Sequence, residues 1–258
     1  MRDKMAYEIL EDIFQNSNRL VCLCGLGAYK ENGYLNFRED EEAYDIEMSY
    51  GYSPEELFSS TFFHTRTELF YQYYRESVLQ LDIIPNEAFK ALAKLEQMGK
   101  LKCCITRCIH GALELAGCKK VINLHGTVSD NTCPRCHKKF PVEYIKQSKR
   151  VPLCENCKAT IRPGVALVGE MISNAAITEA ASAIANADNL LVLGCNLNAF
   201  LSEKFLQYYT GNKLILINEE EHYTDKLADF VVHKKVVDVL PEIVEAIEEK
   251  ECLSQVRA

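Results

Sequence analysis

The sequence contains no tryptophan and only 12 glycines and 7 prolines among its 258 residues. Collagen-like and low-complexity chains need far more glycine and proline, so both classes are excluded. An apolar content of 48% excludes a disordered chain. No apolar run approaches the roughly 20 residues that span a bilayer, and residues 1–8 lack the apolar stretch of a signal peptide. We therefore expect a globular protein with no membrane partner.

The chain also lacks an excess of positive charge. It has 29 basic and 37 acidic residues, which give a net charge of −8. An acidic chain is unsuited to a broad surface for nucleic acid, so we expect no nucleic-acid partner. Cysteine is abundant, with 12 residues. Without a secretory signal these cysteines indicate a reducing compartment rather than a disulfide framework, and we expect a cytoplasmic protein.

Short apolar runs alternate with helical patterns along the chain. The runs are typical of strands buried on both faces of a parallel sheet, and they cover residues 19–25, 102–106, 121–125, 189–194, 213–218 and 228–233. The helical patterns cover residues 5–14, 86–97, 174–186, 201–209 and 236–249. This alternation predicts an α/β fold with a Rossmann-like, doubly wound parallel sheet.

Two stretches interrupt the alternation. Residues 29–84 are rich in Tyr, Phe and Glu, and residues 127–160 are polar, lysine-rich and contain two cysteine pairs. We expect a helical insertion and a zinc-ribbon module, respectively, which together form a smaller domain. The nucleotide-binding domain would then be discontinuous and comprise residues 1–28, 85–126 and 161–258. A ligand crevice is expected between the two domains, at the carboxyl ends of the strands.

The two cysteine pairs have the spacing of a metal site. Cys133 and Cys136 form one C-x-x-C pair, Cys154 and Cys157 form the second, and a seventeen-residue loop separates them. Two such turns present four thiolates tetrahedrally, so the spacing favours one structural zinc ion over a redox pair or two unrelated turns. His137 adjoins the second ligand and is an alternative donor that four cysteines make unnecessary.

A Gly-x-Gly turn follows the first predicted strand. Gly25 and Gly27 would let the backbone approach a pyrophosphate closely. The motif by itself is weak, because the next glycine, Gly33, is not at the usual distance and many turns contain Gly-x-Gly.

Further motifs follow this turn in a fixed order. They are Gly33-x-x-x-Phe37-Arg38, His125-Gly126, the paired C-x-x-C, Arg162-Pro-Gly-Val-Ala-Leu-Val-Gly-Glu170, Gly194-Cys-Asn-Leu197 and Ile217-Asn-Glu-Glu220. In this order and at these spacings the chain resembles the sirtuins, from about residue 20 to residue 240, as a divergent bacterial-type member.

The resemblance implies a function. Sirtuins bind NAD and an acyl-lysine peptide in the cleft between a Rossmann-type domain and a zinc module. The acyl oxygen displaces nicotinamide, a histidine acts as general base on a ribose hydroxyl, and O-acyl-ADP-ribose leaves with the deacylated lysine. His125 occupies the position of that histidine, and an imidazole pKa near 6.5 suits the role. The expected partner is therefore an acylated protein lysine.

The resemblance also assigns the remaining site residues. The acyl-lysine tunnel would contain Val168, Gly169 and Glu170, with Val168 in place of a phenylalanine. The NAD pocket would contain Gly25, Gly27, Phe37, Arg38, Arg107, Cys108, His110, Gly194, Asn196, Asn218 and Glu219.

Several residues of this pocket differ from the family pattern. Leu26 and Tyr29 stand where the family has alanine and serine, and we expect them to crowd the adjacent ribose. Arg107, Cys108 and His110 replace the glutamine, asparagine and aspartate of the segment Thr-Gln-Asn-Ile-Asp-Gly. Arg107 cannot accept a hydrogen bond and Cys108 is a weak donor, whereas His110 can still bond a carboxamide. Each lost neutral hydrogen bond is worth about 0.5–1.5 kcal/mol.

Three functions remain open at this point. The first is a zinc-containing, NAD-dependent protein-lysine deacylase, or an ADP-ribosyl transferase on the same scaffold. The second is a catalytically impaired module that binds NAD or ADP-ribose, which the altered residues 106–110 favour. The third is a structural scaffold, against which the retained Gly25, Gly27, Arg38, Asn218 and Glu219 speak.

Overall fold

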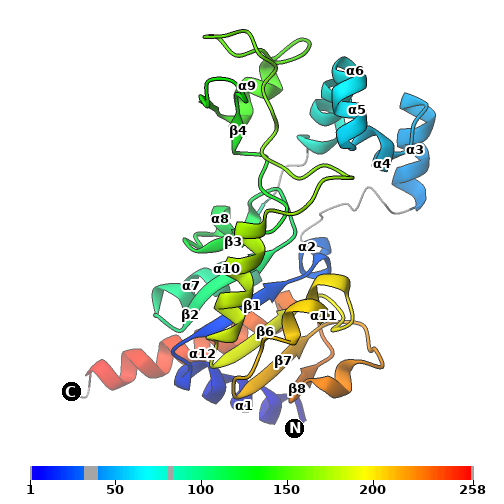
Figure 1. Ribbon diagram of the computed structural model, residues 1–258. Helices are drawn as coiled ribbons and strands as arrows, with labels where there is room; N and C mark the ends of the chain where they lie inside the picture. Colours follow the sequence, from blue (N-terminus) through cyan, green and yellow to red (C-terminus); the bar gives the residue numbers. More distant parts are fainter. Residues whose placement is uncertain (1, 32–39, 81–83, 257–258) are drawn as a thin grey trace.

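A six-stranded parallel sheet forms the centre of the computed structural model, which describes residues 2–31, 40–80 and 84–256 (Figure 1). Its strands are β1 (Leu20–Cys24), β2 (Leu101–Thr106), β3 (Val121–Asn123), β6 (Asn189–Leu193), β7 (Lys213–Ile217) and β8 (Phe230–Val232). They lie in the order β3-β2-β1-β6-β7-β8, and every neighbouring pair is parallel. The predicted Rossmann-like, doubly wound sheet is confirmed, and the chain order reverses between β1 and β6.

Helices cover both faces of this sheet. One face packs against α1 (Arg2–Asn16), α7 (Glu87–Gln97), α8 (Ala112–Ala116) and α12 (Val236–Val256), and the other against α10 (Asn174–Ala185) and α11 (Phe200–Leu206). Successive side chains of a strand point to opposite faces, so Cys22 and Cys24 of β1 join the first core while Val21 and Leu23 join the second. Burial on both faces explains why β1 has no polar residue.

The helices largely match the sequence patterns, and the largest difference is at the end of the last helix. The side chain of Asn86 caps α7 by accepting a hydrogen bond from the N–H of Phe89 at 2.9 Å, which fixes the predicted start. The last helix, α12, continues to Val256 rather than ending at residue 249. A short 3₁₀ turn, η2 (Asp225–Leu227), precedes β8. None of the described helices is both long and apolar enough to cross a membrane.

The two interrupting stretches share a third core. The first contains α3 (Asp40–Tyr50), α4 (Pro54–Leu57), α5 (Ser60–Thr65), α6 (Thr67–Tyr73) and the π-helix η1 (Tyr74–Val78); the second contains β4 (Asn131–Thr132), β5 (Lys139–Phe140) and α9 (Val142–Gln147). Aromatic side chains of the first pack with apolar side chains of the second, and Tyr71 donates a hydrogen bond to the carbonyl of Ile161. Figure 1 shows both stretches beyond the end of the sheet where α2 (Leu26–Lys30) follows β1. The predicted domain boundaries stay a prediction.

Candidate functional site

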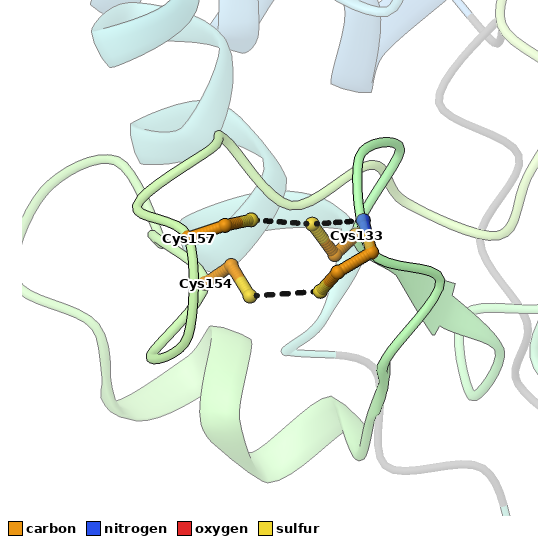
Figure 2. Close-up of side chains that lie close together, drawn as sticks. Cys133, Cys154 and Cys157 are labelled. Carbon is orange, nitrogen blue, oxygen red and sulfur yellow. Dashed lines mark hydrogen bonds between the residues drawn. The ribbon is translucent and has the colours of Figure 1, made fainter.

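The four predicted metal ligands come together in the structure. The sulfur atoms of Cys133, Cys136, Cys154 and Cys157 all lie within 4.8 Å of one another. Figure 2 shows the sulfur of Cys133 facing that of Cys157. The Sγ–Sγ distance is 3.4 Å for this pair and 3.5 Å from Cys136 to Cys154. Four thiolates at about 2.3 Å from a tetrahedral zinc ion would lie about 3.8 Å apart. The cluster therefore fits one structural zinc ion.

Two equivalent turns build this cluster. In the first turn His137 donates its N–H to the carbonyl of Cys133 at 2.9 Å, and in the second Lys158 donates to the carbonyl of Cys154 at 2.9 Å. His137 and Lys158 have positive φ angles of 59° and 60°, which close the two turns. His137 thus serves as a turn residue, and its ring is not part of the ligand group.

The amides of the first turn favour the thiolate form. Desolvation raises the pKa of Cys133, but the N–H groups of Cys136 and Arg135, together with the side chains of Cys157 and Cys136, outweigh it and lower this pKa to about 6. A thiolate is the form that binds metal.

The glycine loop lies against the loop that follows β6. Gly25 donates its N–H to the carbonyl of Leu193 at 2.8 Å, and Gly27 donates to the carbonyl of Gly194 at 2.8 Å. A Cβ atom at Gly25 would lie 2.3 Å from the Cβ of Cys195, and one at Gly27 would lie 2.6 Å from the carbonyl oxygen of Gly194. Only glycine allows the ends of β1 and β6 to approach this closely.

A cavity of about 480 Å³ opens beside these two loops. Of the predicted NAD-binding residues, Gly27, Gly194, Asn196, Asn218 and Glu219 line it, and Gly25 lies directly behind. The side chain of Asn218 donates to Oδ1 of Asn196 at 3.1 Å and to the carbonyl of Glu220 at 2.9 Å. The cavity sits at the reversal point of the sheet, where doubly wound proteins bind nucleotides.

His125 is held next to the predicted substrate tunnel. Its carbonyl accepts a hydrogen bond from Ala166 at 2.8 Å, and the following Gly126 pairs with Val165 in an antiparallel bridge. Gly126 has φ +72°, and a Cβ atom there would lie 2.1 Å from the carbonyl oxygen of Gly164. The half-buried His125 therefore has a fixed backbone and is bonded to Ala166, two residues before the tunnel segment begins at Val168.

Backbone hydrogen bonds to the helical insertion hold the tunnel segment on its other side. Val168 donates its N–H to the carbonyl of Phe58 and accepts from Ser60, both at 3.0 Å. Beyond Gly169, the carboxylate of Glu170 accepts hydrogen bonds from Arg162 at 2.5 Å and from the N–H of Leu167 at 2.8 Å. Val168 remains 36% exposed, so the segment presents an apolar side chain at the surface.

Three of the predicted NAD-binding residues, Arg107, Cys108 and His110, do not line this cavity. Cys108 is 2% exposed, and its sulfur faces Nδ1 of His110 at 3.9 Å. Nε2 of His110 donates to the carbonyl of Val78 at 3.0 Å. His110 lines a separate cavity of about 860 Å³ between α8, α9 and the end of η1, not the cavity beside the glycine loop. Phe37 and Arg38 lie outside the described residues.

Comparison with known proteins assigns the chain to a family. The model of the Sir2 family matches residues 25–200. The NAD-dependent protein deacetylase of Clostridium acetobutylicum is 36% identical over 91% of this chain and 96% of its own length. This chain belongs to the Sir2 family, the sirtuins.

Solved structures of sirtuins superpose closely on this one. A structure described as the structural basis of sirtuin substrate affinity has a TM-score of 0.82 and 33% identity, and the match covers 93% of this chain and 98% of that one. A complex of Sir2 with a p53 peptide and NAD+ has a TM-score of 0.75 and 31% identity, over 93% of this chain and 97% of that one. The resemblance seen in the sequence is confirmed.

One expected clash is absent from this sirtuin. The sequence suggested that Tyr29 crowds the ribose, but its side chain is 1% exposed and packs against Phe89 at a ring distance of 4.8 Å. The hydroxyl of Tyr29 shares a hydrogen bond of 2.7 Å with Thr106. Tyr29 is a core residue, because α2 turns it away from the cavity. Leu26 does line the cavity, as expected.

Glu31 is a site residue that the sequence did not reveal. Its two carboxylate oxygens accept hydrogen bonds of 2.9 Å from the N–H groups of Val236 and Val237, at the start of α12. Glu31 and the neighbouring Lys235 also line the cavity. The sequence shows only an acid within the glycine loop, and nothing in its spacing indicates a partner about two hundred residues away.

His110 gives this sirtuin a testable pH dependence. Burial lowers the pKa of His110, the bond to Val78 opposes the shift, and the charge of Lys146 reinforces it. As pH falls through the unfolded pKa of about 6.5, the unfolded chain gains a proton that the folded chain does not yet accept. Stability should therefore fall as the pH is lowered from about 7 towards the depressed folded pKa.

The expected result is a shallower loss of stability in His110→Gln, which keeps a side-chain N–H for the carbonyl of Val78. Urea unfolding at several pH values from 7 downward measures it. The matched control is His64→Gln on the exposed surface of α5, which should retain the wild-type slope. Equal slopes in wild type and His110→Gln would contradict the assignment.

Proposed function

We propose that this protein is a zinc-containing, NAD-dependent protein-lysine deacylase. The observation that carries the proposal is the position of His125, whose carbonyl accepts a hydrogen bond from Ala166, two residues before the segment of Val168, Gly169 and Glu170. The nucleotide would occupy the cavity beside Gly27, Gly194, Asn196, Asn218 and Glu219, which is open to the end of β1. Curated relatives that are named NAD-dependent protein deacetylases support the same function.

The residues of this chain would have separate roles in binding the nucleotide, binding the substrate and transferring a proton. The glycine loop would let the nucleotide approach the backbone. The amide of Asn218, which is held by Asn196 and the carbonyl of Glu220, would orient the adenosine part of the nucleotide. NAD, when bound, supplies the ribose carbon that accepts the acyl oxygen. His125 would take the proton from a ribose hydroxyl. The segment from Val168 to Glu170 would pair with an acylated protein substrate and exclude water from its lysine.

The zinc ion has a structural role in this proposal. Four thiolates complete its coordination sphere and leave no position for substrate. We also propose a reducing, cytoplasmic location, which is supported by the grouping of four of the 12 cysteines into one metal site.

A second candidate is a module that binds NAD or ADP-ribose without efficient turnover. The positions of Cys108 and His110 favour it, because both side chains are buried away from the nucleotide cavity. In this alternative the adenosine side of the pocket binds while the nicotinamide side has lost its polar contacts.

Calorimetric titration of zinc-loaded protein with NAD and with ADP-ribose separates the candidates. For the deacylase we expect NAD to bind at least as tightly as ADP-ribose, and an acetylated peptide with NAD to yield O-acetyl-ADP-ribose. Binding of ADP-ribose alone, with no product from NAD and peptide, would instead establish the binding module. Binding of neither ligand would overturn both.

A further inference from the structure

Arg162 begins the motif that ends at Glu170, and its backbone is fixed by the zinc module. Its N–H donates to the carbonyl of Thr132 at 2.8 Å, and its carbonyl accepts from the N–H of Thr132 at 3.0 Å. These two bonds form an antiparallel bridge. Thr132 lies in β4, directly before the zinc ligand Cys133. The zinc module therefore sets the position of Arg162, whereas the side chain of Arg162 makes its contacts further along the chain.

The guanidinium of Arg162 binds the chain that follows it. It donates to the carbonyls of Pro163 at 3.2 Å and Val165 at 3.3 Å, and to the carboxylate of Glu170 at 2.5 Å. The side chains of this ion pair are only 27% and 26% exposed. A charged hydrogen bond that is largely removed from water is stronger than a pair on the surface. The pair therefore holds the two ends of residues 162–170 together.

Glu170 uses the same carboxylate oxygen to close a tight turn. This oxygen also accepts the N–H of Leu167 at 2.8 Å, and the N–H of Glu170 donates to the carbonyl of Leu167 at 3.0 Å. Val168 and Gly169 form the exposed tip of this turn. Gly169 has φ +89°, and a Cβ atom there would meet no other atom within 4 Å. The pair of Arg162 and Glu170 therefore fixes the shape of a turn whose tip is open to a ligand.

The same guanidinium contacts the helical insertion. It lies over the ring of Phe63 in α5, at 5.2 Å from the ring centroid. Phe63 is 6% exposed and packs against Phe70 at a ring distance of 5.1 Å and against Tyr71 at 6.0 Å. A cation over an aromatic face is most favourable where both groups are largely removed from water. Arg162 thus joins the zinc module, the turn and the helical insertion, because each of them contacts a different part of this residue.

We propose that Arg162 is a positioning residue for the acylated protein substrate: it fixes the turn of Val168 and Gly169 through Glu170 and does not itself contact the substrate. The inference rests on the proposed function, which places the acylated lysine at this turn. Without the guanidinium, Glu170 keeps its bonds to Leu167 but loses its link to the zinc module and the helical insertion, so the turn is no longer held in one shape. Lysine does not replace Arg162, because an ammonium lacks the planar fork that reaches a carboxylate and two carbonyls at once.

The test combines peptide binding with kinetics on the zinc-loaded protein. The fluorescence anisotropy of a labelled acetyl-lysine peptide gives its Kd, and the production of O-acetyl-ADP-ribose gives KM and kcat. Arg162→Gln should raise the Kd and the KM of the peptide by about tenfold, which is the usual effect of losing a hydrogen bond between charged groups. The kcat, the zinc content and the affinity for ADP-ribose should stay at the wild-type level. Arg162→Lys should show a smaller loss of peptide affinity.

A double-mutant cycle tests whether Arg162 acts through Glu170. The loss of peptide affinity in Arg162→Gln/Glu170→Gln should be clearly smaller than the product of the losses in the two single variants, because all three variants break the same interaction. Arg66→Gln is the matched control. Arg66 is an exposed residue whose guanidinium also lies over an aromatic ring of the helical insertion, at 5.2 Å from the centroid of Tyr52. Arg66→Gln should match wild type in every measurement.

Three outcomes would overturn this inference and leave the proposed function intact. An unchanged peptide Kd in Arg162→Gln would exclude a positioning role. Parallel losses of peptide affinity, ADP-ribose affinity and zinc in both Arg162→Gln and Arg162→Lys would show that the residue only supports the fold. Losses that multiply in the double-mutant cycle would show that Arg162 does not act through Glu170. A wild-type protein that binds no acetyl-lysine peptide and forms no O-acetyl-ADP-ribose would instead overturn the proposed function together with this inference.

Discussion

Replacing Cys154 with serine is expected to abolish zinc binding and unfold the region around residues 131–161. Zinc sites of this kind contribute about 10–16 kcal/mol of apparent binding free energy, and that free energy is coupled to folding. Cys133 and Cys154 are themselves fully buried and share a core with Phe140, Ile145 and Ile161. The other apolar side chains of this segment, which has two short strands and one short helix, pack in the same core and depend on the zinc ligands for their positions. Loss of one ligand should therefore remove most of its structure.

The loss of structure in the Cys154→Ser protein should not extend into the sheet. The helices α1, α7 and α12 belong to a different core, so a Cys154→Ser protein should retain a folded sheet and melt in two steps. Metal analysis and hydrogen exchange measure the two parts of the prediction. Cys252→Ser is the matched control, because this cysteine is exposed near the end of α12 and should change neither zinc content nor melting. A Cys154→Ser protein with full zinc content and wild-type melting would contradict the site.

Replacing His125 with alanine is expected to reduce deacylation by about 10²–10⁴-fold, which is the usual contribution of a general base. The zinc content and the affinity for ADP-ribose should stay unchanged. The reason is that His125 holds its neighbours through its carbonyl oxygen, which accepts from Ala166 and is kept in the alanine variant. Production of O-acetyl-ADP-ribose from NAD and an acetylated peptide measures the activity.

The control for this experiment is His64→Ala, which removes an exposed imidazole from α5 and should leave turnover at the wild-type level. A variant at His125 that loses zinc as well as activity would report a folding defect, and the more conservative His125→Asn would then replace it. Turnover close to wild type in a folded His125 variant would remove this residue from the role of general base.

Much of the fold follows from local patterns. Each strand of the sheet is short and apolar, because both of its faces are buried, and the same runs were recognisable without any structure. The capping residue Asn86 marks the start of α7 for an equally local reason. The end of α12 was predicted too early, since its last turns carry charged residues and depend on packing against α1 and α7.

The candidate site was only partly predictable. Spacing along the chain was enough to predict the role of the cysteine pairs and of the glycines Gly25, Gly27 and Gly194. The structure brings the cysteines together in one cluster and the glycines together in one close contact. The segment from Arg107 to His110 was not predictable in this way, because contacts distant in sequence, such as the bond of His110 to the carbonyl of Val78, decide which way its side chains point.

The doubly wound sheet and the zinc ligands could be predicted because they depend on periodicity and on residues close together in the chain, and membership of the sirtuins followed from the order of the motifs. Where the substituted side chains point depends on contacts between distant segments. Tyr29 enters the core and bonds Thr106, His110 turns to the carbonyl of Val78, and Glu31 reaches the start of α12. Each of these choices pairs a buried polar group with a partner distant in sequence, and an unpaired buried polar group costs more free energy than any local preference supplies.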